Sequence, residues 1–300
     1  MTTRTTRIGF VGLGRMGGNM TARLLGAGYT VYGTNRTRER ARRLIVEDGL
    51  RWCDTPRQVA DAADVVFSSL PDDDAIEAVT AGSDGLLAGL AAGNTWIDVS
   101  TVSPSLSRHL ASRVRESGAR RLDAPVSGSV PQVQAGTLTI MVGGNRDAYE
   151  RVAPILRELG TPTRVGDNGQ AQVLKLAINI SLGAQMLALA EGLLLAEHAG
   201  LDPGFALGLM TDSAIGSPML KARAPIVLDP PDEAWFDIAL LAKDMELARD
   251  AGREMRVPLP AADRTAEILA AARKLGYERQ DIAALFQVLE RLSGPEARAA

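Results

Sequence analysis

The pattern of hydrophobic and polar positions changes about halfway along the chain. In the first half, short apolar runs alternate with segments of helical spacing, and the runs are residues 7–11, 30–33, 65–70 and 95–99. Such alternation is typical of a parallel sheet with helices on its faces. After Val165 no strand pattern is found. The sequence therefore predicts an α/β domain over residues 1–165 and an all-helical domain over residues 166–300.

A long helix is predicted to open the second half. A Gly/Asp/Asn turn at residues 166–169 precedes about thirty residues that are rich in Leu and Ala and contain no proline. Lys175 and Asn179 lie four residues apart, so they share one face of this helix. An ammonium beside a carboxamide can protonate and orient a substrate oxygen. Alternatively, Lys175 extends to solvent and Asn179 is a hydrogen-bonded core amide.

Further helices are predicted after the long one, at residues 203–212, 237–255, 260–275 and 281–292. The first of these has Asp202 as its N-cap and Pro203 at its first position, which is a typical helix start. An all-helical domain with so apolar a leading helix often hides surplus apolar surface in a subunit interface. We therefore expect a homodimer or a homotetramer.

Composition and charge narrow the class of protein. The 300 residues are 46% hydrophobic, which suffices for two cores, and the longest uncharged apolar run, 176–190, is too short to span a bilayer. The N-terminus has no apolar signal core, so we expect a cytoplasmic protein. A single cysteine and two distant histidines argue against a metal site, and a net charge of −3 argues against nucleic-acid binding. The expected partners are small molecules and copies of this chain.

A glycine-rich motif follows the first predicted strand directly. Gly12, Gly14 and Gly17 form the pattern G-x-G-x-x-G before a helical segment at residues 19–25. The first glycine permits a tight turn, the second lets backbone amides approach a pyrophosphate, and the third lets helix and strand pack closely. The motif predicts a Rossmann-type domain in which the cofactor is bound by Gly12, Leu13, Gly14, Met16 and Gly17.

The end of the second predicted strand bears on which dinucleotide binds. An acidic residue there would hydrogen-bond the ribose 2′-hydroxyl of NAD and repel a 2′-phosphate. Here the residues are Asn35, Arg36 and Thr37, with no acid before Glu39. Arg36 can pair with a phosphate dianion and its polar neighbours can complete the site, which predicts NADP(H) over NAD(H). Asn35 and Thr37 can alternatively cap the helix predicted at residues 38–47.

Other polar or small residues follow the ends of later strands, where a parallel sheet binds its ligands. One strand end carries Leu70-Pro71-Asp72 and the next carries Asp98-Val-Ser100-Thr101, so these residues are expected to line the cofactor groove. Ser100 and Thr101 can instead cap the helix predicted at residues 104–116.

A turn of small residues, Ser127, Gly128 and Ser129, follows a further strand end. Its open backbone N–H groups would suit a carboxylate, although an ordinary β-turn is the alternative. Residues 135–144 then alternate like a strand, which we interpret as another edge of the same domain.

Several motifs follow one another in order along nearly the whole chain: IGFVGLGRMGGNM from Ile8, DVST from Asp98, DAPVSGS from Asp123, AGTLTIMVGG from Ala135, KLAIN from Lys175 and AKDMELA from Ala242. Together they resemble the β-hydroxyacid dehydrogenase family, which includes 3-hydroxyisobutyrate dehydrogenases, tartronate semialdehyde reductases and glyoxylate/succinic semialdehyde reductases and is 6-phosphogluconate dehydrogenase-like. The resemblance implies a Rossmann domain followed by an all-helical domain, led by a long interdomain helix, with the active site between them.

The resemblance also implies roles for single residues. Lys175 is the catalytic acid/base and Asn179 is its partner at the substrate oxygen. Thr101 contacts the nicotinamide side of the cofactor, and Lys243 closes over cofactor and substrate. Because Asp244 and Glu246 follow Lys243 closely, a solvated charged face is the alternative there.

For substrate binding, the resemblance implies that Ser127 and Gly128, with Ser129 beside them, hold the substrate carboxylate. The run Asn35-Arg36-Thr37 is similar to that of the NADPH-dependent glyoxylate/succinic semialdehyde reductase branch. The six-residue spacing from Gly169 to Lys175 is also similar to that branch.

The expected reaction is hydride transfer between NADP(H) and the carbonyl carbon of a small acid of the glyoxylate, succinic semialdehyde or 3-hydroxyisobutyrate type. Lys175 would protonate the oxygen as it gains charge. An imine reductase of the same architecture and a non-catalytic NADP(H)-binding protein are the alternatives. The presence of Lys175, the expected proton donor, counts against both alternatives.

Overall fold

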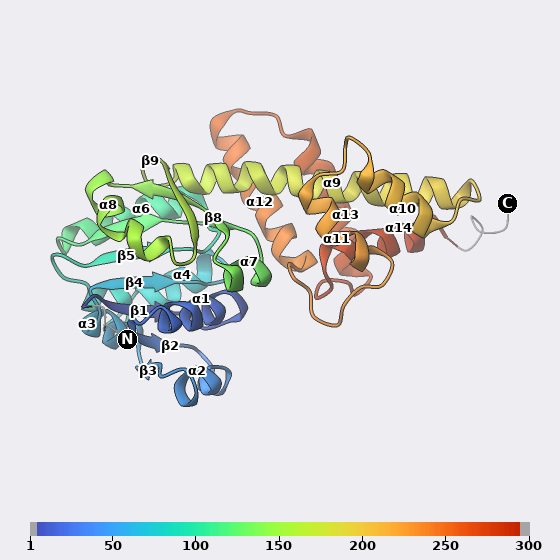
Figure 1. Cartoon of the computed structure of the whole chain (residues 1–300). Helices are drawn as coiled ribbons and strands as arrows, with labels where there is room; N and C mark the ends of the chain where they lie inside the picture. The colour runs from blue at the N-terminus through green and yellow to red at the C-terminus, as the bar shows by residue number, and fades with distance from the viewer. Residues whose placement is uncertain (1–4, 295–300) are drawn as a thin grey trace. The chain divides into compact units, whose positions relative to one another are not determined.

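The computed structural model describes residues 5–294, and the chain divides into two compact units, Met1–Lys175 and Leu176–Ala300 (Figure 1). The division falls inside one continuous helix, α9 (Gln170–His198). An α/β unit therefore precedes a helical unit, as the sequence predicts.

The first unit is built on a nine-stranded sheet. Its strands are β1 (Arg7–Val11), β2 (Thr30–Thr34), β3 (Arg51–Trp52), β4 (Val65–Ser68), β5 (Thr95–Asp98), β6 (Arg120–Asp123), β7 (Val126–Ser127), β8 (Leu138–Gly144) and β9 (Gly160–Gly166). Their spatial order is β3-β2-β1-β4-β5-β6-β8-β7, with β9 paired to β8. All pairs from β3 to β6 are parallel. The order reverses between β1 and β4, and a doubly wound sheet binds its ligand at that reversal, beyond the carboxyl ends of the strands.

The far side of the sheet departs from the sequence-based expectation. β8 is antiparallel to β6 and β7 and parallel to β9, so it lies inside the sheet and the predicted edge position is wrong. The strand also begins later than predicted, because residues before it form the short helix α7 (Val130–Ala135). β9 escaped prediction because its sequence, GTPTRVG, has no apolar run. Its pairing with β8, a tertiary contact, makes it a strand.

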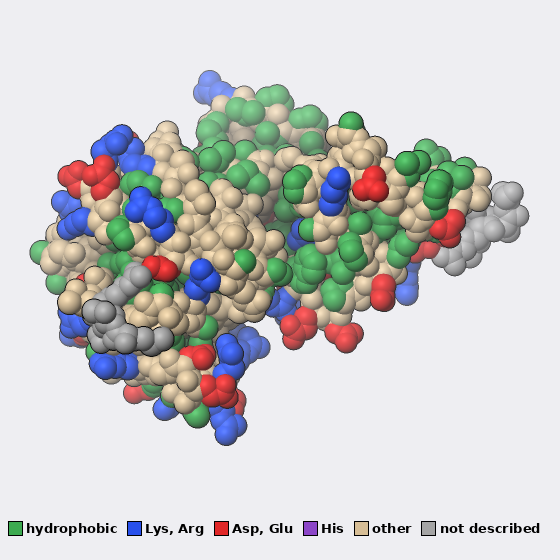
Figure 2. Space-filling model, in the orientation of Figure 1, with side chains coloured by type: hydrophobic (Ala, Val, Ile, Leu, Met, Phe, Trp, Pro, Cys, Tyr) green, Lys and Arg blue, Asp and Glu red, His purple; other side chains and the backbone are tan. Residues whose placement is uncertain are grey.

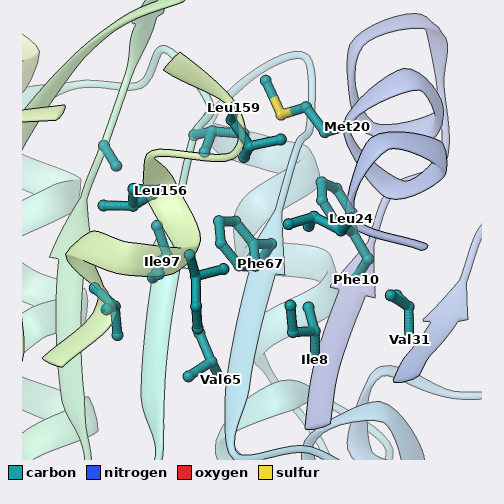
Figure 3. Close-up of a cluster of buried hydrophobic side chains, with 14 of the residues drawn as sticks. Ile8, Phe10, Met20, Leu24, Val31, Val65, Phe67, Ile97, Leu156 and Leu159 are labelled. Carbon is teal, nitrogen blue, oxygen red and sulfur yellow. The ribbon is translucent and has the colours of Figure 1, made fainter. Parts of the chain in front are cut away.

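Helices cover both faces of the sheet. One face packs against α1 (Arg15–Gly26), α2 (Arg42–Val46) and α8 (Arg146–Leu156), and the other packs against α3 (Pro56–Ala62), α4 (Asp73–Thr80), α5 (Leu86–Gly89) and α6 (Pro104–Glu116). On the first face, the rings of Phe10 and Phe67 stack with centroids 5.6 Å apart, and Leu24 of α1 lies near them (Figure 3). These fully buried side chains hold the central strands rigidly, and a rigid sheet positions its strand ends.

The described part of the second unit, residues 176–294, is helical and contains no strand. After α9 its helices are α10 (Pro203–Asp212), α11 (Pro218–Val227), α12 (Ile238–Met255), α13 (Pro260–Lys274) and α14 (Leu285–Ser293). The sequence predicts four of these five helices. The fifth, α11, carries the same start signal as α10: a Ser217 side chain that caps the helix and a proline at its first position.

The core of the helical unit forms around the middle of α9. Leu193 of α9, Leu241 of α12 and Leu269 of α13 belong to one cluster, and all three are fully buried. By length and composition alone α9 also qualifies as a candidate membrane span, although the cores of many globular domains contain helices that do so. Of its most apolar window, 44% is buried inside the protein. Apolar surface therefore remains uncovered along α9.

Candidate active site

The glycine-rich loop lies at the carboxyl end of β1. Gly12 has a φ of +90°, and a Cβ atom there would lie 2.4 Å from the carbonyl oxygen of Ser69. A Cβ atom on Gly17 would lie 2.0 Å from the carbonyl oxygen of Gly12, so neither position tolerates a side chain. Gly14 differs, because no atom lies within 4 Å of the position its Cβ would take. This open space at the N-terminus of α1 fits a dinucleotide pyrophosphate.

The two other residues predicted to bind cofactor in this loop turn toward the interior. Leu13 is 3% exposed, and Met16 packs against the same hydrophobic cluster. The N–H of Leu13 donates to Oδ1 of Asn35 at 3.1 Å. The loop is thereby tied to the end of β2.

Asn35 braces the segment that follows β2. Besides accepting from Leu13, its Nδ2 donates to the carbonyl oxygen of Thr37 at 2.9 Å. Thr37 precedes a short 3₁₀ turn, Arg38–Ala41, but its side chain makes no capping hydrogen bond. The continuous helix predicted at residues 38–47 is therefore wrong in detail: it is this turn followed by α2. Arg36 and Thr37 are both exposed beside the braced loop.

Ser100 joins the ends of β4 and β5. Its Oγ accepts from the N–H of Leu70 at 2.9 Å, and its own N–H donates to Oδ1 of Asp98 at 3.1 Å. The capping role considered for Ser100 and Thr101 is wrong, because Ser103 caps α6 by accepting from the N–H of Leu106. Ser100 instead ties together the two strand ends expected to line the cofactor groove.

A buried ion pair stabilises these strand ends. Nη2 of Arg121 donates to Oδ2 of Asp98 at 2.6 Å, and both side chains are fully buried. The guanidinium lies 4.8 Å from the ring centroid of Trp96, and the indole Nε1 of Trp96 donates to Oγ of Ser68. Because each charged group has several partners, the network is rigid despite the desolvation cost of burying it.

The predicted carboxylate turn follows β6. Gly128 is exposed with a φ of +122°, and a Cβ atom there would lie 2.8 Å from Cδ2 of Leu138, so glycine is required. The N–H and the hydroxyl of Ser129 are both engaged by Oε1 of Gln132, at 2.9 and 3.1 Å. Ser127 is half-buried beside them. Of the three residues, Ser127 and Gly128 are therefore better placed to receive a ligand than Ser129.

Lys175 and Asn179 lie on α9, four residues apart. Lys175 is half-buried and Asn179 is 1% exposed. In the helical unit, Nδ2 of Asn179 donates to Oδ2 of Asp244, and Nζ of Lys243 lies 2.9 Å from Oδ1 of the same carboxylate. Asp244 thus joins the two polar residues that the family resemblance singles out in this unit.

Asp244 is not among the site residues that the sequence predicts. The alternative of a solvated charged face on this part of α12 holds for Glu246, which is exposed and pairs with Arg249. It is wrong for Asp244, which is 2% exposed. A signal was present, because Asp244 follows Leu241 by three residues and precedes Ala248 by four, which places it on the buried face of α12.

Two family models together match most of the chain. The NAD binding domain of 6-phosphogluconate dehydrogenase matches residues 7–171, and the NAD-binding domain of NADP-dependent 3-hydroxyisobutyrate dehydrogenase matches residues 169–289. The chain is 36% identical over 293 residues to 2-(hydroxymethyl)glutarate dehydrogenase of Eubacterium barkeri, with 97% of each chain covered. It is 31% identical to glyoxylate/succinic semialdehyde reductase 2, chloroplastic, of Arabidopsis thaliana, with 98% of this chain and 82% of the relative covered.

A solved structure shows the same similarity in three dimensions. Psf3 in complex with NADP⁺ and 2-OPP matches with a TM-score of 0.85 at 30% identity, over 94% of this chain and 99% of that one. The fold and the glycine-rich loop define an NAD(P)-binding oxidoreductase, and the relatives support activity on CH–OH groups. The chain belongs to the β-hydroxyacid dehydrogenase family.

Proposed function

We propose that this protein transfers a hydride between NADP(H) and a small aldehyde or keto acid, with Lys175 as the acid/base. The observation that carries the proposal is the polar set on α9 and α12. A half-buried Lys175 lies one helical turn before a buried Asn179, whose amide is oriented by Asp244. Buried polar groups need such partners, and an oriented amide beside a lysine is suited to bind an oxygen that gains charge.

The residues that would hold the cofactor come from the first unit. The amides around Gly14 would bind the pyrophosphate, and Arg36 with Thr37 would bind the 2′-phosphate, because both are exposed beside a loop that Asn35 already braces. Leu70, Pro71 and Thr101 would line the nicotinamide half. When bound, the nicotinamide supplies or accepts the hydride.

The proton is handled by the chain's own side chains. In the reductive direction the ammonium of Lys175 donates a proton from Nζ to the substrate oxygen, and in the oxidative direction its neutral amine takes the proton back. The amide of Asn179, which Asp244 orients through its bond to Nδ2, would donate to the same substrate oxygen. Ser127 and Gly128 would receive the substrate carboxylate, and Lys243 would add a second positive charge near it.

Asp244→Asn tests the orienting carboxylate. The variant keeps the shape of the side chain but removes the charge that pairs with Lys243, and it leaves one acceptor oxygen where Lys243 and Asn179 now use two. Since hydrogen bonds to charged groups contribute about 1.5–3 kcal/mol, kcat/KM for the aldehyde acid should fall by roughly 10- to 100-fold. Glu246→Gln, on the exposed face of the same helix, is the matched control and should stay within about twofold. Equal values of kcat/KM for the two variants would show that Asp244 has no role in the site.

The function is tested by following consumption of NADPH, and separately of NADH, by the purified protein. The substrates are glyoxylate, succinic semialdehyde, tartronate semialdehyde and methylmalonate semialdehyde, with a cyclic imine as the comparison. We expect NADPH-dependent turnover of at least one aldehyde acid. Turnover of the imine alone would show an imine reductase, and binding of NADPH without turnover of any compound would favour the non-catalytic alternative.

We also propose that the helical unit forms a homodimer or homotetramer. Large apolar side chains lie exposed on it, and Figure 2 shows hydrophobic atoms gathered on its surface. Leu195 of α9 is 74% exposed, Phe205 and Leu209 of α10 are 65% and 62% exposed, and Ile215 beyond α10 is 72% exposed. Large apolar side chains exposed in such number mark interaction sites.

Light scattering on the eluting protein should give a mass that is a multiple of the 31.8 kDa chain mass. Replacing Phe205 and Leu209 together with aspartate should shift the protein to a smaller mass, because two charges would be buried in the interface. Leu275→Asp, at the end of α13, is the control and should leave the mass unchanged. A wild-type protein that elutes as a monomer would contradict the proposal.

A further inference from the structure

The first turn of α9 carries a buried amide that the proposed mechanism does not use. Gln172 is fully buried. Its Oε1 accepts from the N–H of Val102 at 3.2 Å, and its Nε2 donates to the carbonyl oxygen of Ser100 at 3.0 Å. The side chain therefore accepts from one backbone N–H of this loop and donates to one backbone carbonyl oxygen, as the backbone of a paired strand would. It attaches α9 to the segment that follows β5.

A second attachment lies just before the helix. Asp123, at the end of β6, accepts from Nδ2 of Asn168 at 2.7 Å and from the N–H of Gly169 at 3.0 Å. Burial raises the pKa of this carboxyl, opposed by the nearby Arg121 and by these two donors. All of these residues belong to the first compact unit. The start of α9 is thus held at two points, on the ends of two adjacent strands.

The loop that Gln172 holds is itself fixed. Ser100 uses its carbonyl oxygen for Gln172, its hydroxyl for Leu70 and its N–H for Asp98. A continuous series of hydrogen bonds therefore runs from the end of β4 through Ser100 to α9. Lys175 follows Gln172 by only three residues, which is less than one helical turn.

We propose that Gln172, together with Asp123, is a positioning residue for the acid/base Lys175. The two side chains fix the first turn of α9 against the strand ends, both in its rotation about the helix axis and in its position along that axis. A parallel sheet binds its ligand at these strand ends. Nζ of Lys175 is thereby held at a set distance from the reacting carbonyl oxygen. The inference rests on the proposed function, and it gives a role to an amide that is fully buried in the first turn of α9.

Gln172→Met tests the inference, because methionine keeps the length and bulk of the side chain but makes neither hydrogen bond. Since a misplacement of about 1 Å can reduce turnover by about 10²-fold, we expect kcat to fall by roughly 10- to 100-fold. The Kd for NADPH and the KM for the aldehyde acid should change by less than about threefold, because the glycine-rich loop, Arg36 and the Ser127-Gly128 turn are untouched. The isotope effect with deuterated NADPH should rise as the chemical step becomes slower.

Asn94→Leu is the matched control. Asn94 lies just before β5, at the opposite end of the strand, and makes the same two kinds of bond: Oδ1 accepts from the N–H of Ala91 at 2.7 Å, and Nδ2 donates to the carbonyl oxygen of Ala63 at 2.9 Å. Its loss should lower Tm about as much as the loss of Gln172, since each variant loses two hydrogen bonds to backbone, yet leave kcat within about twofold. Asp123→Asn, which weakens the other attachment, should reproduce the fall in kcat.

A kcat for Gln172→Met no lower than that for Asn94→Leu would overturn the inference. If Gln172→Met does not fold, an unchanged kcat and isotope effect in Asp123→Asn would overturn it instead. Failure of the proposed function itself is distinguishable, because it would show as no turnover by the wild-type protein or as wild-type turnover by Lys175→Ala.

Discussion

Replacing Lys175 with alanine is expected to lower kcat by about 10²–10⁴-fold, the usual contribution of a positioned acid/base group. The substrate oxygen would gain charge during hydride transfer without a cation to stabilise it or a proton to neutralise it. The Kd for NADPH should change little, because Lys175 is not among the residues expected to bind the cofactor. Steady-state kinetics and a titration of NADPH fluorescence measure the two quantities separately.

The control for this prediction is Lys274→Ala, at the exposed end of α13, which should keep wild-type turnover. Addition of a small primary amine such as methylamine should restore part of the activity of Lys175→Ala, because it returns an ammonium to the vacated space. Wild-type turnover in Lys175→Ala would exclude the lysine from the mechanism. A low turnover that no amine restores would indicate a role in packing.

Replacing Arg36 with leucine should lower kcat/KM for NADPH by roughly 10- to 100-fold, since a hydrogen bond to a charged phosphate contributes about 1.5–3 kcal/mol. The value for NADH should change by less than about twofold, because NADH has no 2′-phosphate. The loop should keep its shape in the variant, since Asn35 braces it through Leu13 and Thr37 and does not depend on Arg36. Assays with both cofactors measure the ratio of kcat/KM for NADPH to kcat/KM for NADH directly.

Arg42→Leu is the matched control for the change in cofactor preference. Its guanidinium is 75% exposed on α2 and pairs with Glu39. We expect it to leave both values of kcat/KM unchanged. A wild-type protein that prefers NADH, or an equal loss with both cofactors in Arg36→Leu, would contradict the assignment of Arg36 to the phosphate.

Local sequence signals were sufficient for much of the fold. The first strand and the glycine-rich turn could be predicted because a buried parallel strand needs a continuous apolar run and because a helix packed closely on a strand needs glycine at the crossing. The start of α10 was predicted to the residue, with Asp202 capping the N–H of Phe205. Caps and prolines act through neighbouring backbone groups, so the chain carries this information within a few residues.

The candidate site was predicted less completely, because polar residues acquire partners from distant parts of the chain. Ser100 resembles a helix cap in sequence, but in the structure it joins two strands through Leu70 and Asp98. Asp244 resembles a surface charge but is buried against an amide 65 residues earlier in the chain. Spacing can place Asp244 on the buried face of α12, but the partners of Ser100 and Asp244 cannot be derived from it, because they depend on which segments the fold brings together.

The sequence by itself determined the two classes of structure, the glycine-rich loop, the helical spacing of Lys175 and Asn179 and the family, because each depends on residues that are close in the chain or on motifs in a fixed order. Only the tertiary structure decided that β8 lies inside the sheet, that β9 is a strand, and that Gln172 and Asp123 hold the start of α9. The physical reason is the distance along the chain over which each interaction acts. Propensity, capping and periodicity act over a few residues, whereas the burial of a polar side chain is favourable only when a partner from elsewhere in the chain compensates its lost hydration.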